Sequence, residues 1–321
     1  MKQSAMSLNQ AEQTFLIIDG HALIYRSFHA FPPLTTNNGE LVGAVYGFLR
    51  VLLTVLKQVE PSHWLVAFDH PAPTKRKLAF DFYKANRPEM PQELRSQVSL
   101  IEEAVVHLGI PEYKIAGIEA DDIIGTVAKL AVKSGVGAVR ILTGDKDSFQ
   151  LVDEHIHVLV PNVGRAKNKG DKSALIEYGS ALVEQKMGVS PQYIVDFKAL
   201  AGDSSDNITG VPGIGAKTAA ALIQKYGSVE HIYQLLDQEL LEKEKSGVLS
   251  KLSAGRQSAM VSKQLATIDV QVELDFNLDN CRVGGYQKEQ MYQFLQRLGF
   301  TSLLKLLPAD DFDLDLQQTL F

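Results

Sequence analysis

The sequence is poor in cysteine, because Cys281 is the only one among 321 residues. A single thiol excludes a disulfide framework and a cysteine-based zinc site, so a reducing cytoplasm is the expected location. Long apolar runs are also missing, and none reaches the roughly 18 residues of a membrane-spanning helix. The opening MKQSAMSLNQAEQ is polar and has no apolar core of a signal peptide. We therefore expect an ordinary soluble globular protein, monomeric and without a membrane partner.

The net charge of −6 argues at first against a polyanionic partner, but the acids are not evenly spread. Carboxylates follow the apolar runs FLIID, WLVAFD and ILTGDKD, and recur in GIEADD and GDSSDN. If the runs are parallel strands, these carboxylates meet at the carboxyl edge of the sheet, where open α/β proteins place their sites. They are Asp19, Asp69, Glu119, Asp121, Asp122, Asp145, Asp147, Asp203 and Asp206.

So many carboxylates need counter-charge, because two like charges about 4 Å apart repel by roughly 4 kcal/mol at an effective dielectric near 20. Hard divalent cations with oxygen ligands relieve this repulsion. Each acid also has an ordinary interpretation: Asp19 could cap a helix, Asp69 could be solvated, and EADD could be an acidic first helical turn. The joint pattern favours a multi-metal site that acts on phosphate.

Hydrophobic periodicity divides the chain near residue 175. Before it, apolar runs alternate with helical patterns, which predicts a mostly parallel α/β sheet with helices on both faces. We expect strands at 15–18, 63–68, 139–142 and 157–160, and helices at 41–58, 92–107 and 120–134. Beyond it the pattern is helical, at 173–186, 191–201, 217–225 and 228–241. The expected domains are an N-terminal arm at 1–14, a core at 15–174, a helical domain at 175–300 and an acidic tail at 301–321.

Two segments break the core pattern. Residues 163–172, VGRAKNKGDK, are polar and basic and predict a mobile loop. Residues 70–95 show no strand pattern and predict an excursion from the sheet edge, although a solvated helix face would look similar. Cations outnumber acids in this excursion: Lys75, Arg76, Lys77, Lys84, Arg87 and Arg95 against Asp81, Glu89 and Glu93.

A glycine-rich turn follows GDSSDN, in the string GVPGIGAKTAAALI. Gly213 and Gly215 flank the turn, and Lys217 and Thr218 open the next helix. Backbone N–H groups at such a helix start bind phosphate oxygens, and Lys217 adds a positive charge. An ordinary turn between packed helices is the alternative. The Walker pattern is missing, so ATP binding is not supported.

These motifs together resemble the 5′-nuclease domain of bacterial DNA polymerase I, within the flap endonuclease family. The strings that carry the resemblance run from about Phe15 to about residue 300: FLIIDGHALIYRSFHAFPPL, VAFD, YKANRPEMPQELRSQ, GIEADDIIGT, LTGDKDSFQLV and DFKALAGDSSDNITGVPGIGAKTAAALIQKYGSV. The resemblance implies a PIN-like nuclease core, a helical arch at about 70–100, and a helical DNA-binding domain with a helix-hairpin-helix turn at 207–225.

The resemblance also implies roles for residues. One divalent ion would lie near Asp19, Asp69, Glu119 and Asp121, and a second near Asp145, Asp147, Asp203 and Asp206, with Asp121 and Asp122 close to both. Mg²⁺ is the expected metal, with Mn²⁺ as a substitute. Tyr83, Lys84 and Arg87 match the family's active-site residues on the arch. The expected DNA contacts are Arg76, Gly213, Ile214, Gly215, Ala216, Lys217 and Thr218. A potassium ion would bind the backbone carbonyls of Leu200, Ala201, Thr209, Val211 and Ile214.

The implied activity is a structure-specific 5′ to 3′ exonuclease and 5′-flap endonuclease in primer removal or repair. A related nuclease for RNA or RNA–DNA hybrids is the alternative enzyme. A non-catalytic binder of DNA structure is the alternative outside enzymes, and it is disfavoured because every acidic position is filled. The family member resembled continues into a polymerase, so this chain is expected to be a stand-alone nuclease or an excised domain. Its last residues, QQTLF, resemble peptides that bind the bacterial sliding clamp, through Gln317, Leu320 and Phe321; a frayed tail is the alternative.

Overall fold

The computed structural model describes residues 13–162, 175–241 and 244–308. The predicted N-terminal arm lies almost entirely outside these ranges. The basic loop at 163–172 and the proposed clamp-binding residues Gln317, Leu320 and Phe321 lie outside them as well.

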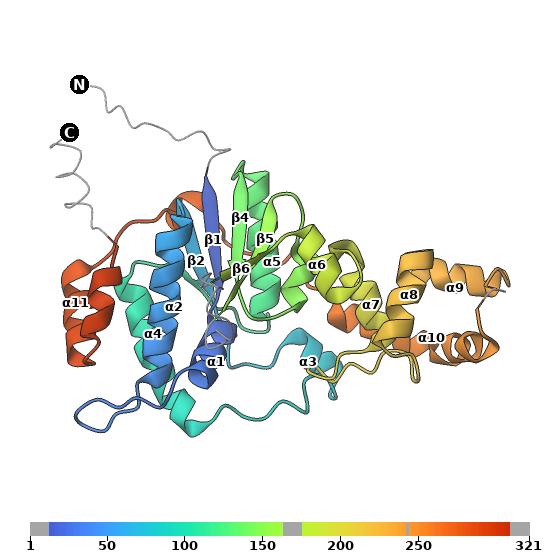
Figure 1. The fold of residues 1–321 in the computed structure, drawn as a ribbon, viewed down its shortest axis with the longest axis horizontal. Coiled ribbons are helices and arrows are strands. Elements are labelled where there is room, and N and C mark those ends of the chain that lie inside the picture. The colour runs from blue at the N-terminus through green and yellow to red at the C-terminus, as the bar shows by residue number, and fades with distance from the viewer. Residues whose placement is uncertain (1–12, 163–174, 242–243, 309–321) are drawn as a thin grey trace, which may run out of the picture.

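The described residues form one six-stranded sheet in the order β3-β2-β1-β4-β5-β6 (Figure 1). The strands β1 (Thr14–Asp19), β2 (His63–Ala67), β3 (Glu112–Tyr113), β4 (Ala138–Leu142) and β5 (Ile156–Pro161) are parallel, and β6 (Leu175–Tyr178) is antiparallel to β5. The chain builds outward from β1 to β3 and then resumes at β4 on the other side of β1. This reversal places a crevice at the carboxyl ends of β1 and β4, the usual site position in open α/β sheets.

Alternating residues of β1 serve two cores. Phe15 and Ile17 are fully buried on the side of α5 (Ala120–Lys133), whereas Leu16 and Ile18 are fully buried on the other side. That second side is covered by α1 (Gly20–Ala30), α2 (Gly43–Val59) and α4 (Gln92–His107). Burial on both faces explains why the strands read as continuous apolar runs, and it confirms the predicted three-layer fold.

The four predicted strands match β1, β2, β4 and β5, but the helix expected at 173–186 is wrong in its first part. Residues Leu175–Tyr178 form β6, and the helix α6 begins only at Ser180 (Ser180–Met187). The string LIEY has no period long enough to separate strand from helix, and pairing with β5 decides its conformation. The sheet therefore continues past the boundary expected near residue 175.

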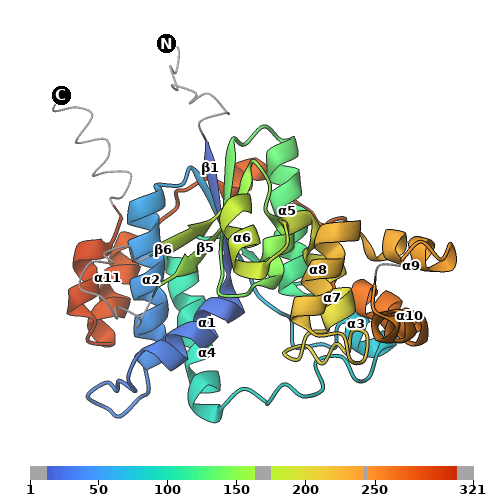
Figure 2. The same cartoon turned by 45° about the vertical axis from the view of Figure 1, so that its right-hand side comes forward.

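The helices that directly follow α6 extend to one side of the sheet (Figure 2). α7 (Ile194–Ala201) packs against α8 (Ala216–Tyr226) and α10 (Ser246–Ala266), and α9 (Val229–Asp237) contacts α8 and α10. α7, α8 and α9 confirm the helices expected at 191–201, 217–225 and 228–241. No helix among the described residues is long and apolar enough to cross a bilayer.

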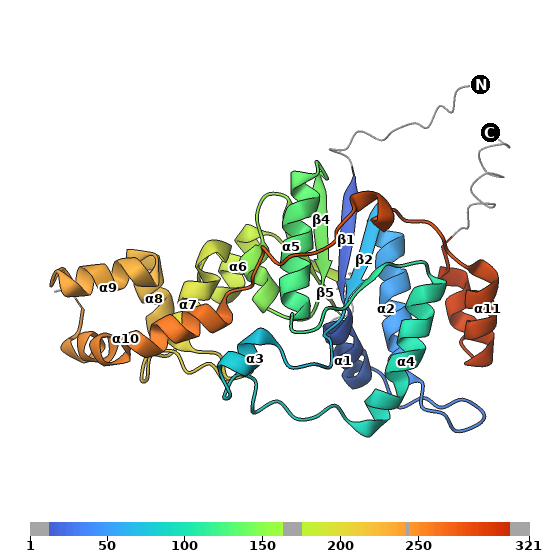
Figure 3. The ribbon, with the colours of Figure 1, turned by 180° about the vertical axis from the view of Figure 1, so that it is seen from behind.

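From α10 the chain returns across the core in an extended segment, seen from behind in Figure 3. Along it, the Tyr113 hydroxyl donates to Asp275 O (2.9 Å), and Val283 N donates to Ser62 O (2.9 Å). The chain then enters α11 (Lys288–Arg297), whose Met291, Phe294 and Leu295 join the core of α2 and α4. The end of the expected helical domain thus packs on the α/β core.

Candidate active site

Carboxylates from three strand ends line one cavity of about 900 Å³ at the crevice. Asp19 ends β1, Asp69 follows β2, and Asp145 follows β4. Asp121, from the first turn of α5, joins them. The structure brings these four residues together, as the pattern of strand-end acids predicts.

Hydrogen bonds fix Asp19 between two elements. Its Oδ1 accepts from Ala22 N (3.0 Å), so it caps α1, and its Oδ2 accepts from the Thr143 hydroxyl (2.6 Å). Thr143 Oγ1 also accepts from Asp145 N (2.9 Å). Thr143 therefore joins the ends of β1 and β4, so the capping interpretation and the site interpretation of Asp19 are both satisfied.

Burial and neighbouring acids together raise the pKa of three carboxylates at the site. Burial raises the pKa of Asp19 to about 7, and the charges of Asp145 and Asp69 add to the increase. The pKa of Asp121 rises for the same reasons, burial first and then Asp145 and Asp19. Burial and Asp145 raise the pKa of Asp147 to about 7 against the opposing effect of Lys198. A cation bound among these carboxylates would lower their pKa values again.

A second cavity of about 690 Å³ adjoins the first and contains Asp145, Asp147 and Asp203. Lys198 of α7, only 4% exposed, lies between two of these acids. Its Nζ donates to Asp203 Oδ2 (2.6 Å) and to Asp147 Oδ1. Burial would lower the pKa of Lys198, but the two carboxylates raise it to about 12. Lys198 is not among the site residues expected from the sequence, although a lysine within the apolar run VDFKALAG is a signal for it.

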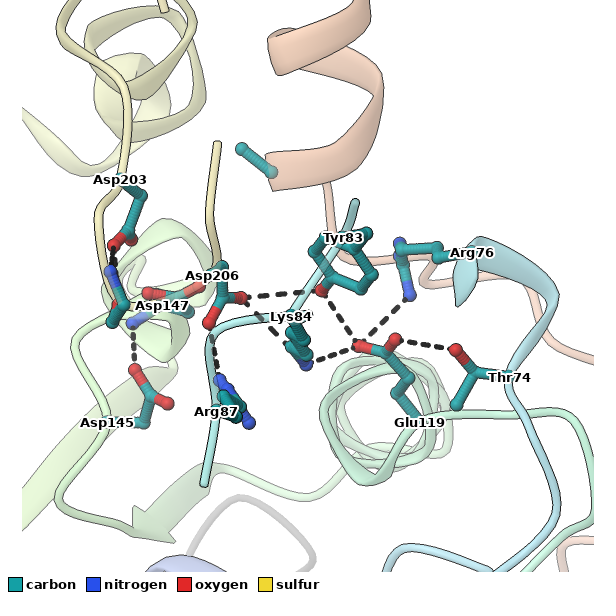
Figure 4. A network of polar contacts seen from close by, with 12 residues as sticks. Thr74, Arg76, Tyr83, Lys84, Arg87, Glu119, Asp145, Asp147, Asp203 and Asp206 are labelled. Atoms are coloured by element: carbon teal, nitrogen blue, oxygen red, sulfur yellow. Dashed lines mark hydrogen bonds and ion pairs between the residues drawn. The ribbon is translucent and has the colours of Figure 1, made fainter. Parts of the chain in front are cut away.

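The basic excursion crosses the carboxyl edge of the sheet and delivers its cations to the acids. It contains one short helix, α3 (Lys75–Ala79), and then turns and irregular chain as far as α4 (Figure 1). Lys84 Nζ lies 2.8 Å from Glu119 Oε2, and the Tyr83 hydroxyl donates to the same oxygen at 3.1 Å (Figure 4). Arg87 pairs with Asp206. All three predicted arch residues thus lie at the acid cluster.

These contacts set the charge of their partners. Burial would raise the pKa of Glu119, but Lys84 and Arg76 outweigh it and the pKa falls below its usual value. Burial would lower the pKa of Lys84, but Tyr83, Glu119 and Asp121 reverse the direction and raise it. Both groups therefore stay charged at neutral pH.

Asp122 and Arg76 do not line this cavity, although Arg76 Nη1 lies 3.6 Å from Glu119 Oε2 (Figure 4). Arg76 forms a two-pronged pair with Asp122 (2.6 and 2.8 Å) and donates to Thr267 O (2.6 Å). Asp269 N donates to Asp122 Oδ1 (2.8 Å). This pair joins the arch, α5 and the extended segment after α10. The structure thus places a predicted metal ligand and a predicted DNA contact in a structural joint.

The glycine-rich hairpin lies at the start of α8, and its residues line neither of the two acid-containing cavities. Gly213 has a φ of +82°, which favours glycine, and its carbonyl accepts from Lys251 Nζ (3.0 Å). Gly215 caps α8, Ala216 and Lys217 are exposed, Thr218 is half-buried, and Ile214 is buried. Two of the expected potassium carbonyls accept hydrogen bonds within the hairpin: Leu200 O from Val211 N, and Val211 O from Ile214 N.

Two family models match adjoining parts of the chain. The model described as the 5′-3′ exonuclease N-terminal resolvase-like domain matches residues 14–188, and that of the 5′-3′ exonuclease C-terminal SAM fold matches residues 189–289. The chain belongs to the 5′-3′ exonuclease family. The junction of the two matches lies after α6, and the sheet lies wholly within the first.

Curated relatives of this exonuclease chain are longer proteins. DNA polymerase I of Pseudomonas aeruginosa is 42% identical over 92% of this chain and 31% of its own length. That of Caldicellulosiruptor bescii is 40% identical over 91% of this chain and 33% of its own length. The thermostable DNA polymerase I of Thermus thermophilus is 41% identical over 90% of this chain and 32% of its own length. The chain spans about one third of the length of these relatives.

Solved structures confirm the fold of the exonuclease chain. The bacteriophage T5 5′-exonuclease with bound zinc matches with a TM-score of 0.62 at 21% identity, covering 89% of this chain and 100% of that one. The catalytic core of Rad2 in complex with DNA substrate matches with a TM-score of 0.58 at 17% identity, covering 94% of this chain and 95% of that one.

The candidate acids of this exonuclease chain are of the ligand type that binds hard divalent cations. Every candidate ligand is a carboxylate oxygen, the donor that Mg²⁺ and Mn²⁺ prefer. Burial, together with neighbouring acids, raises the pKa of Asp19, Asp121 and Asp147, and a bound cation would favour their ionised forms. Within residues 13–162, 175–241 and 244–308, no three histidine, cysteine or acidic side chains are arranged to hold a metal as they stand. Lys84, Arg87 and Lys198 hold several of the acids instead. These ion pairs involve Glu119, Asp206 and Asp147, and none of them involves Asp19, Asp121 or Asp145.

Proposed function

We propose that this chain is a metal-dependent nuclease that hydrolyses DNA phosphodiesters at 5′ ends and 5′ flaps. The carrying observation is the 900 Å³ cavity in which strand-end carboxylates face the arch cations Lys84 and Arg87. Carboxylates alone would repel a phosphodiester, whereas carboxylates that bind metal beside fixed cations attract it. The relatives support this substrate, since the T5 flap endonuclease is described in complex with DNA and metal ions.

Asp19, Asp69, Glu119 and Asp121 would hold one divalent ion, and Asp145, Asp147, Asp203 and Asp206 a second. Mg²⁺ is the proposed metal and Mn²⁺ its substitute. When bound, such a pair activates a water and polarises the scissile phosphate. Asp122 would contribute through its joint with Arg76, because its carboxylate oxygens accept from Arg76 and Asp269 N.

The protein's own cations have a separate task. Lys84 and Arg87 come from the arch and would stabilise the negative charge that develops on the phosphate. Tyr83 is 2% exposed and donates to Glu119, so it holds the base of the arch against α5. These residues would orient the strand and exclude water around the reacting phosphate.

The hairpin would bind duplex away from the cut. Gly213 to Thr218 offer backbone N–H groups and the Lys217 ammonium to phosphates. Phosphate contacts carry no base information, so specificity would be for DNA structure. We include in the proposal the division into a nuclease core and a helical DNA-binding domain, and a potassium ion on the carbonyls of Leu200, Ala201, Thr209, Val211 and Ile214.

The proposed setting is primer removal or repair in the cytoplasm, by a monomer. The QQTLF segment would bind a sliding clamp through Gln317, Leu320 and Phe321. An extended peptide with apolar anchors suits a preformed groove.

Cleavage of an end-labelled duplex with a 5′ flap, with and without Mg²⁺, tests the proposal. We expect metal-dependent release of the flap, and no release when a chelator is present. A matched substrate with an RNA flap distinguishes the alternative enzyme: faster cleavage of RNA would replace DNA as the substrate. Binding without cleavage in any metal would make the chain a DNA-structure binder.

A further inference from the structure

Three cavities follow one another along the carboxyl edge of the sheet. The first, of about 900 Å³, lies over β1 and β2 and contains Asp69 and Lys114. The second, of about 690 Å³, shares Tyr25, Arg87 and Asp145 with the first. A third, of about 650 Å³, shares Arg26, His29, Gly144 and Lys146 with the second and continues over β5 and β6. The carboxylate site therefore opens into a channel that runs away from α4 and the arch.

The third cavity has a charge opposite to that of the site. Arg26, His29, Lys146 and Lys186 line it, and among the described residues its lining contains no aspartate or glutamate. We refer to these four residues as the basic channel. In a chain with a net charge of −6, the positive charges of Arg26, Lys146 and Lys186 make this cavity a marked local exception. Its charge complements a polyanion.

The channel residues come from α1, from the loop after β4 and from α6, and the fold brings these elements to one side of the sheet (Figure 2). Arg26 lies on α1, donates to Pro161 O at the end of β5, and lies beside Gly144, where an added Cβ would be 3.3 Å from its Nη1. Lys146 is exposed between Asp145 and Asp147, so it joins the acids to the channel. Lys186 is exposed in the last turn of α6.

The channel also has an apolar wall. Tyr178 of β6 packs against Phe149, with ring centroids 4.8 Å apart, and Ile176 is 38% exposed. Both Tyr178 and Ile176 line the third cavity. Cations beside an aromatic and an aliphatic wall suit a nucleotide, whose phosphate and whose base or sugar need different neighbours.

We propose that the basic channel binds the phosphodiester backbone of a substrate strand as it continues past the cut, on the side of the carboxylates opposite the arch. The inference rests on the proposed function, because it extends the path of the same substrate. Lys146 would contact the phosphates nearest the acids, and Lys186 those further along. The contact is electrostatic and independent of base sequence.

Lys186→Ala tests the channel, since Lys186 lies outside the two acid-containing cavities. Lys133→Ala is the matched control, because Lys133 is also an exposed lysine in the last turn of a helix, α5. Each is placed in an Asp121→Asn background so that binding to a 5′-flap duplex is measured without cleavage. We expect Lys186→Ala to weaken affinity about threefold or more and to reduce the slope of log affinity against log salt by about one unit. Lys186→Glu should weaken it further, and Lys133→Ala should change neither quantity.

Uncharged methylphosphonate linkages, placed in the DNA backbone, identify which substrate strand occupies the basic channel. These linkages are introduced one at a time. A neutral linkage at the channel should weaken DNA binding by the Lys133→Ala protein but leave DNA binding by the Lys186→Ala protein unchanged. Its position shows whether the occupant is the cut strand or its complement. Identical slopes for both lysine variants, or no linkage with this behaviour, would overturn the channel while wild-type cleavage of the flap still stood. Failure of the wild type to cut or bind the flap would overturn the proposed function itself.

Discussion

At the scale of single residues, the site balances a surplus of carboxylates with cations from other elements. Lys84 reaches Glu119 from a left-handed backbone conformation, with a φ of 53°. A non-glycine residue in that region is unusual, and such positions cost of order 1–3 kcal/mol. The hydrogen bond from Lys84 N to Asp206 O (2.9 Å) holds it there. Strain at this position fits a side chain that must reach one particular place.

Lys84→Ala should lower the single-turnover cleavage rate by roughly 10²-fold or more while affinity changes much less, because a lost transition-state donor costs that much. Rapid-quench kinetics and binding titrations on one flap substrate measure the two effects. Lys75→Ala, an exposed lysine in the same excursion, is the control and should keep the wild-type rate. Equal losses of rate and affinity in Lys84→Ala would make Lys84 a simple phosphate anchor.

The raised pKa values predict how stability depends on pH without metal. Asp19 has a pKa of about 7 in the folded protein against an ordinary value of 3.8. The folded state therefore binds this proton more tightly than the unfolded state does. Its contribution to the free energy of unfolding is complete below about pH 4 and is lost as the pH rises through about 7. The pKa of Asp147 is also raised, to about 7, so its effect on stability has the same sign. Glu119, with a lowered pKa, acts oppositely, but only as the pH falls below its ordinary value of 4.5.

The chelated protein should therefore unfold at a lower temperature near pH 8 than near pH 5.5. Mg²⁺ should raise the unfolding temperature more at the higher pH. Asp19→Asn should flatten this dependence, since the amide does not titrate and can still cap α1. Scanning calorimetry of both proteins measures it. A wild-type unfolding temperature that rises between these pH values would contradict the surplus of negative charge.

At the scale of elements, α8 and its hairpin are separate from the chemistry. Lys217→Ala should weaken binding to all duplex-containing substrates alike and reduce the salt slope by about one unit, because it removes one phosphate contact. Titrations of flap, nicked and blunt duplexes at several salt concentrations measure this. Lys57→Ala, an exposed lysine in the last turn of α2, is the control. A changed preference between base sequences with an unchanged slope would speak against the hairpin as a backbone contact.

The elements that sequence predicted best are those with one dominant local signal. Central strands buried on both faces read as apolar runs, and each ends at a polar residue such as Asp19. β3 and β6 were missed because Glu112–Tyr113 has two residues and Leu175–Tyr178 is a partly exposed edge. Their conformation comes from pairing with β2 and β5, which no local pattern contains.

The candidate site divides in the same way. Strand order places Asp19, Asp69 and Asp145 at one edge, so their meeting could be predicted. The partners of Asp122 could not, because Arg76 is 46 residues away and Asp269 is 147 residues away. Lys198 was missed because its burial between two acids depends on how α7 packs against the sheet edge. Long-range packing thus decides which acids line the cavity and which serve as joints.

At the scale of the whole molecule, the extended segment after α10 couples the parts. The Arg76–Asp122 pair connects the arch to α5, and Asp269 N and Thr267 O connect that pair to the segment. The segment then leads to α11 on the opposite side of the sheet (Figure 3). The arch, the core and the helical part therefore share one polar joint beside the site.

The terminal segment carries a prediction of its own. Deleting residues 317–321 should leave cleavage of short free flaps unchanged and remove binding to a bacterial sliding clamp, because Leu320 and Phe321 would be the apolar anchors. Tethering would raise the local concentration of nuclease at nicks. Calorimetric titration of the clamp with both chains measures the affinity. Equal affinities, or none with either chain, would leave QQTLF as a frayed tail.

The central claim is that the carboxylate cavity hydrolyses DNA with bound metal while other surfaces hold the duplex. Asp121→Asn tests it most directly, since Asp121 lines the cavity and the amide keeps the shape but removes a negative charge. The measurement is cleavage and binding of one labelled 5′-flap duplex in Mg²⁺ by the wild type and this variant. We predict that the variant loses cleavage and keeps its affinity within about tenfold, because the cavity performs the chemistry and the hairpin holds the DNA. Wild-type cleavage by Asp121→Asn would contradict the account.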